Sequence, residues 1–245
     1  MAAATVAWRA TTTDYYFNKY DYSNGWYSFG KQDAWCWMNC ERENNTLTEG
    51  KGTLDASGNL HISFPAAIDT SPVSQVISIE ADITDSNNQV VSNRTSVVVH
   101  KTNVYVGVKT DDYVVTPGSS AHVSVVTLNP DGTPKKNQTV TARLFARQWN
   151  TVRKKGVDGE YYYDNEKKDT FVSQIAITTD DKGKGKGDIV VENGGEYVIA
   201  ASAKDEGNRE TVAETSVYSW SNTYYNWPHS NNDRIAIVAD KPEYE

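Results

Sequence analysis

The densest group of side chains that could bind a ligand is aromatic and lies near the start of the chain. Eleven of the 30 residues from Trp8 to Trp37 are aromatic, against 11% of the whole chain. Rigid rings mixed with Asn, Asp, Ser and Gly can form a platform for sugars or an anchor for a protein partner. They can equally pack on the chain's own sheets or on a neighbouring domain. The candidate interaction residues are Trp26, Tyr27, Trp35 and Trp37.

The two cysteines, Cys36 and Cys40, lie within the same segment. In a continuous strand their Cα atoms would be roughly 13 Å apart, whereas a disulfide needs about 4.4–6.8 Å. A disulfide therefore requires a turn at residues 37–39, and a local disulfide and two free thiols both remain open. A metal site is less favoured, because the pair lacks evident partners and the nearest histidine, His61, sits in an ordinary strand pattern.

Patterns of catalytic residues are not found. The four histidines are scattered, and none lies in a zinc-protease helix motif or beside a nucleophile elbow. The Gly-Lys run at 183–187 lacks the spacing and the following helix of a phosphate-binding loop. The acidic turns lack the residue order of a calcium loop. We therefore expect no catalytic, cofactor-binding or metal site, and no enzyme.

The elements around these residues read as β-strands. Ile77, Ile79, Ala81 and Ile83 alternate with polar residues, and residues 139–147 and 196–203 repeat this pattern. Short clusters of Asn, Asp, Gly and Pro separate such runs, as in tight turns. Many short strands with closely spaced turns predict an all-β fold of antiparallel β-sandwiches.

Charge and hydropathy exclude two classes of protein. The 24 basic and 32 acidic side chains give a net charge of −8, which argues against binding to nucleic acid. No stretch approaches the ~18 consecutive apolar residues of a transmembrane helix. The first ten residues lack the basic and apolar regions of a signal peptide.

An internal repeat organises the chain. Residues 79–97 and 199–217 align without a gap, with seven identities in 19 positions. The second copy follows a complete set of strands, whereas the unit that contains the first copy starts at its third strand.

We predict three regions: residues 1–101, an incomplete sandwich with an aromatic-rich excursion at 11–49; 102–230, a complete sandwich; and 231–245, the first strand of a following domain. An incomplete sandwich exposes its core face, so we expect the first unit to be less stable than the second.

The order of these motifs resembles the macroglobulin-like domains of bacterial α2-macroglobulins. The similar stretches are 75–100 (QVISIEADITDSNNQVVSNRTSVVVH), 104–118, 128–150, 194–208 and 231–245. The resemblance implies tandem immunoglobulin-like sandwiches of about 100 residues in a large extracytoplasmic protease trap, which is periplasmic, on the cell surface or secreted. Such traps present a bait segment to proteases, and many carry a reactive thioester.

The chain departs from the complete family pattern, because neither Cys36 nor Cys40 has a thioester context and no bait segment is evident. The resemblance therefore implies a scaffold section of a broad-range endopeptidase inhibitor, ahead of the bait-bearing domain. The implied partners are neighbouring macroglobulin domains of the same longer chain and, through the whole protein, target proteases. The alternative is an Ig-like repeat surface adhesin or a carbohydrate-binding module that uses the aromatic segment 8–37. The polar stretch 147–169 reads as a long hairpin connection or as a contact surface for another domain.

Overall fold

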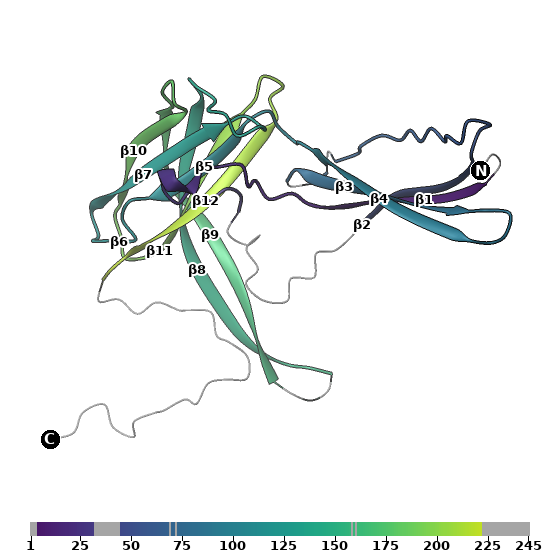
Figure 1. Cartoon of the computed structure of the whole chain (residues 1–245). Coiled ribbons are helices and arrows are strands. Elements are labelled where there is room, and N and C mark those ends of the chain that lie inside the picture. The colour runs from purple at the N-terminus through teal and green to yellow at the C-terminus, as the bar shows by residue number, and fades with distance from the viewer. Residues whose placement is uncertain are drawn as a thin grey trace.

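The computed structural model describes residues 4–31, 45–68, 70–71, 73–157, 159 and 161–221. These residues form β structure with one short 3-10 helix, η1 (Tyr22–Asn24), and no α-helix (Figure 1). The predicted all-β class with antiparallel sheets is therefore confirmed. The predicted strand at 231–245 and the Cys36–Cys40 pair lie outside the described residues.

The N-terminal unit is a single antiparallel sheet in the order β2-β1-β3-β4. Its strands are β1 (Thr5–Asp14), β2 (Asn45–Thr53), β3 (Gln75–Thr84) and β4 (Val90–Val99). One face is apolar and carries the buried Val6, Ala10 and Ile77. Among the described residues no second sheet opposes this face. The segment that follows β2 crosses it instead, and Phe64 stacks on Trp8 with ring centroids 5.7 Å apart.

The second unit is a sandwich of two sheets. The three-stranded sheet has the order β10-β7-β5, and the five-stranded sheet has the order β6-β12-β11-β8-β9. The strands of the first are β5 (Tyr105–Thr110), β7 (Ser119–Leu128) and β10 (Lys184–Val191). The strands of the second are β6 (Val114–Val115), β8 (Thr139–Lys155), β9 (Tyr161–Thr178), β11 (Gly195–Lys204) and β12 (Glu210–Ser219). Fully buried side chains such as Val125, Leu144 and Ile199 fill the space between the two sheets.

The repeat found in the sequence is also a repeat of structure. Strands β3 and β4, moved along the chain by 120 positions, have the same bounds as β11 and β12. Both units also carry a β-bulge at the corresponding place. In the first unit, Leu47 of β2 is the extra residue and lies opposite the step from Ala10 to Thr11 in β1. In the second unit, Val172 of β9 is the extra residue and lies opposite the step from Leu144 to Phe145 in β8. The N-terminal sheet therefore corresponds to the five-stranded sheet of the second unit.

Four turns share one local design. Each begins with an aspartate whose Oδ1 accepts the backbone N–H groups two and four residues further on. The residue three positions on has a positive φ between 59° and 78°, which Gly and Asn tolerate. The four pairs are Asp55 with Gly58, Asp85 with Asn88, Asp180 with Gly183, and Asp205 with Asn208.

Candidate functional site

The aromatic segment lies on the second unit and spans both of its sheets. We call residues 15–31 the aromatic strap. Ser28 exchanges two backbone hydrogen bonds with Val108 of β5, at 2.9 and 3.0 Å. The carbonyl of Gly30 accepts the N–H of Glu214 in β12, at 2.9 Å. The strap thus adds to the edge of the three-stranded sheet and also reaches the five-stranded sheet.

The rings of the strap cover the outer face of the three-stranded sheet. Phe17 stacks on Tyr105, with ring centroids 4.3 Å apart. Phe29 lies against Gly107 of β5, where a Cβ atom would come within 2.7 Å of its ring. The glycine therefore lets the ring approach the sheet backbone closely. The buried members of this cluster are Phe17, Tyr27, Tyr105, Val126 and Leu128.

The structure separates the candidate interaction residues of the sequence analysis. Tyr27 belongs to the buried cluster, with 9% of its surface exposed and the Lys109 Nζ 5.5 Å from its ring centroid. Trp26 is 76% exposed and contacts Tyr22, with ring centroids 5.0 Å apart. Trp35 and Trp37 lie outside the described residues. Of the two described residues, only Trp26 presents its ring to solvent.

A hydrogen-bonded node joins the two units around Tyr105. Its hydroxyl lies 2.7 Å from Ser74 Oγ and 2.8 Å from His100 Nδ1. The backbone N–H of Lys101 donates to the same Ser74 oxygen, at 3.0 Å. Burial raises the pKa of Tyr105 to about 12, so its hydroxyl stays protonated at neutral pH. Burial, with the charge of Lys19, lowers the pKa of His100, so the node favours the neutral imidazole.

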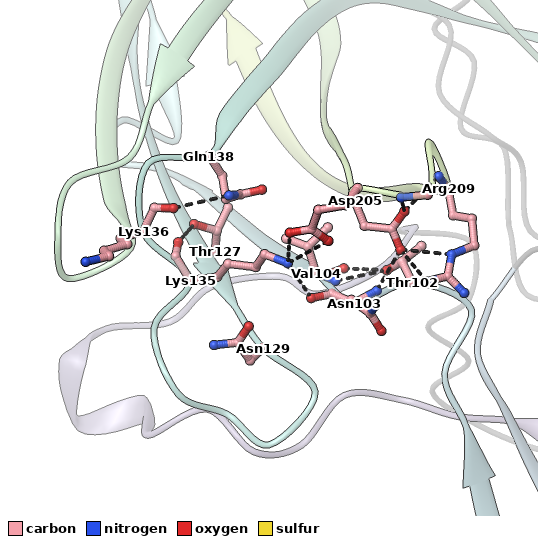
Figure 2. A network of polar contacts seen from close by, with 12 residues as sticks. Thr102, Asn103, Val104, Thr127, Asn129, Lys135, Lys136, Gln138, Asp205 and Arg209 are labelled. Atoms are coloured by element: carbon pink, nitrogen blue, oxygen red, sulfur yellow. Dashed lines mark hydrogen bonds and ion pairs between the residues drawn. The ribbon is translucent and has the colours of Figure 1, made fainter.

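A second polar network fixes the linker between β4 and β5, as Figure 2 shows. Asp205 Oδ2 accepts the backbone N–H of Asn103 at 3.0 Å and Arg209 Nε at 2.9 Å. Lys135 Nζ donates to the Asn103 carbonyl at 3.1 Å and pairs with Glu206. The linker is thus held by two loops of the second unit.

Asp205 is the most strongly perturbed carboxyl group of this network. Its burial alone would raise its pKa, because a charged carboxylate loses hydration. The hydrogen bonds from Asn103 and Arg209, with the charge of Arg209, outweigh burial and lower the pKa to about 2. In the sequence, Asp205 is only one of the seven identities of the repeat, where it aligns with Asp85. Its role at the linker was missed because Asn103 lies 102 positions earlier in the chain.

Among the residues that the structure describes, no group of three or more His, Cys, Asp or Glu side chains is placed to hold a metal ion. No helix in this described part of the chain is long and apolar enough to span a bilayer.

A family model and several solved structures that are similar to this chain all come from bacterial macroglobulins. Residues 106–220 match the family model described as bacterial macroglobulin domain 6. The native conformation of Escherichia coli alpha-2-macroglobulin matches with a TM-score of 0.60 and 17% identity, over 99% of this chain and 16% of that chain. Salmonella alpha-2-macroglobulin reacted with methylamine matches with a TM-score of 0.58 and 16% identity, over 89% of this chain and 15% of that chain.

A third solved structure, Escherichia coli alpha-2-macroglobulin activated by porcine elastase, has a TM-score of 0.58 and 16% identity, over 91% of this chain and 19% of that chain. The chain therefore spans less than a fifth of the length of these structures, and at such identities the likeness concerns the fold. No curated protein is similar enough in sequence to count as a match.

Proposed function

We propose that the chain is a scaffold section of a larger protease-trapping protein, because residues 106–220 match the family model described as bacterial macroglobulin domain 6. Its partners in this role are neighbouring macroglobulin domains of the same longer chain. Target proteases are engaged by the whole extracytoplasmic protein and not by this section. The section itself performs no catalysis.

The observation that carries this proposal is the joint between the two units. The strap covers the outer face of the three-stranded sheet, the Tyr105 node ties β5 to Ser74 and His100 of the first unit, and the Asp205 network fixes the linker. Three separate sets of contacts oppose rotation of one unit against the other. A stiff joint suits a section that must transmit a rearrangement from one domain to the next.

The joint can be tested by single-molecule energy transfer between dyes on β4 and β10 of the full chain. We expect one narrow distance distribution. The variant Phe17→Ala/Tyr105→Phe should broaden it, because it removes the ring stack and the hydroxyl of the node. Tyr22→Phe, which removes a partly exposed hydroxyl from the same strap, is the control and should leave it unchanged. A broad distribution in the unmodified chain would refute a stiff scaffold.

A protease assay tests the absence of trapping by this section. The chain is mixed with trypsin, and cleavage of a large protein substrate is compared with cleavage of a small peptide. A scaffold section should slow neither reaction beyond simple competition. Selective protection of the large substrate would mean that the chain traps proteases by itself, which contradicts the proposal.

The alternative of a carbohydrate-binding surface has one observation in its favour, the exposed Trp26 ring beside Tyr22. Calorimetric titration with a panel of glycans tests it. Binding that disappears in Trp26→Ala would support this function over the scaffold, and the absence of binding to every glycan would remove it.

A further inference from the structure

The β8–β9 hairpin continues well beyond the sandwich. Strand β8 pairs with β11 only as far as Arg147, and from there β8 and β9 pair only with each other up to Lys155 and Tyr161 within the described residues. Figure 1 shows this part as a two-stranded arm that projects away from the sheets. We call residues 148–155 and 161–168 the arm. Eight residues of extended chain reach about 26 Å.

The base of the arm is held firmly. Arg147 donates from Nε and from a terminal nitrogen to the two oxygens of Asp169, both at 2.8 Å. Trp149 Nε1 donates to Glu196 of β11 at 2.8 Å. Arg147 is only 8% exposed, so this pair is shielded from water more than a surface ion pair. These contacts fix the direction in which the arm leaves the sheet.

The two faces of the arm differ in charge. Residues directly opposite each other in an antiparallel pair point to the same face. We call one face the basic face, and neither of its two strands contributes a carboxylate to it. Its residues are Trp149, Thr151, Arg153, Lys155, Tyr161, Tyr163, Asn165 and Lys167. The opposite face carries Asp164 and Glu166, and there Lys154 is already paired with Asp164. Arg153 and Lys155 therefore lie on the face that has no carboxylate in this stretch.

The centre of the basic face is prearranged for a carboxylate. The Arg153 guanidinium lies 4.3 Å from the centroid of the Tyr161 ring, and Lys155 Nζ lies 5.8 Å from it. Stacking on an aromatic ring restrains the guanidinium and leaves its N–H edge available for a bidentate contact. The chain as a whole carries a net charge of −8, so a cationic surface here stands out against its surroundings.

We propose that the basic face of the arm binds an extended acidic protein segment. A peptide is favoured over a polysaccharide because Arg153 already covers the Tyr161 ring that a sugar would stack on. It is favoured also because the outer edge of β8 from Gln148 onward pairs with no described strand, so its N–H and C=O groups can pair with an added strand. A bilayer is disfavoured because the connection at the tip contains Asp158 and Glu160. This proposal does not depend on the scaffold role.

The test uses the full chain and fluorescently labelled poly-L-glutamate, with binding measured by anisotropy at two salt concentrations. Arg153→Ala/Lys155→Ala should weaken binding at least tenfold. The matched control, Lys154→Ala/Lys168→Ala, removes the same charge from the opposite face and should change binding less than threefold. Tyr161→Leu keeps every charge but removes the ring under Arg153, and should weaken binding at least threefold. All these residues are exposed, and unchanged thermal unfolding verifies the fold.

Four outcomes would overturn the proposal. Equal losses in the two double variants would mean nonspecific attraction between charges. Tighter binding to alginate than to poly-L-glutamate would assign the face to an acidic polysaccharide, and tighter binding to phosphatidylglycerol vesicles would assign it to a lipid surface. No binding of poly-L-glutamate at low salt would exclude the acidic segment altogether.

Discussion

At the scale of the residue, two equivalent turns of the repeat are used differently. Asp85 and Asp205 occupy equivalent positions, and the Oδ1 atom of each accepts two backbone N–H groups of its own turn. Only Asp205 uses its second oxygen for a distant partner, the N–H of Asn103, and also binds Arg209. Residue 89, the counterpart of Arg209, is a glutamine. The turn that links the two units therefore has Arg209 where the simple turn has Gln89.

Asp205→Asn should lower the free energy of unfolding by about 2 kcal/mol at pH 7, the value that corresponds to a pKa lowered from 3.8 to about 2. Because the folded-state pKa is depressed, this stabilisation is present above pH 4 and is lost as the pH falls from about 4 towards 2. The difference between variant and parent should therefore shrink over that interval. Urea unfolding at several pH values measures it.

The matched control is Asp85→Asn in the first unit, which keeps the turn geometry and should cost less than about 0.5 kcal/mol. Equal costs for the two variants would show that the linker contacts of Asp205 contribute nothing.

At the scale of the element, the strap depends on a strand surface that admits it. Phe29 approaches the backbone of β5 because Gly107 has no side chain. Ser28 then pairs with the next residue, Val108, so the ring contact and the backbone pairing reinforce each other. A larger residue at position 107 would push the ring away and strain this pairing.

Gly107→Ala should therefore loosen the strap, because the new Cβ would lie 2.7 Å from the Phe29 ring and 2.8 Å from Val126. Limited proteolysis within residues 18–31 should be several times faster than in the parent. In a Phe29→Ala background the same substitution should add little to the proteolysis of the strap, because the remaining close contact, with Val126, lies within the sheet and not in the strap. Additive effects of the two substitutions would show that the ring contact is not the cause.

The sequence predicted those elements whose side chains alternate regularly. Val140, Ala142 and Leu144 read as one buried face, and all three lie in the core. The repeat likewise predicted the β3–β4 and β11–β12 hairpins. The strap could not be placed in this way, because Phe17, Tyr27 and Phe29 follow no period and their partners lie about 100 residues away.

The length of the arm's strands was missed for another reason. Residues 147–169 were expected as a long hairpin connection or as a contact surface for another domain, and in the structure the strands of this hairpin continue to Lys155 and resume at Tyr161. Both faces of the arm contact solvent, so the alternation of polar and apolar residues that marks a half-buried strand is absent. Backbone pairing sustains this hairpin without that pattern.

At the scale of the whole molecule, the two units differ in how well their sheets are covered. In the second unit, the two sheets bury their inner faces against each other, and the strap covers the outer face of the three-stranded sheet. In the first unit, Val91 and Val97 on the apolar face are 62% and 53% exposed. Ile79 and Ile83 are only partly buried, although their counterparts Ile199 and Ala203 lie in the core of the second unit.

Hydrogen exchange of the full chain should reflect this difference in coverage. We expect amides of β3 and β4 to exchange at least tenfold faster than amides of β11 and β12, their structural counterparts, because opening the first unit exposes less apolar surface. Mass spectrometry of peptic fragments measures both pairs of strands in one sample. Equal protection would contradict the lower stability expected for the first unit.

The bulge at Val172 has a consequence for how a mutation could alter the arm. With the bulge, Arg153 faces Tyr163 and Thr151 faces Asn165. Closure of the bulge without loss of a residue would shift the rest of β9 by one position, so that Arg153 would face Asp164 and Thr151 would face Glu166. The basic face would then neutralise itself. A substitution at the bulge that changes only the strand register, with no replacement of any charged residue, could thus abolish the surface that distinguishes the arm.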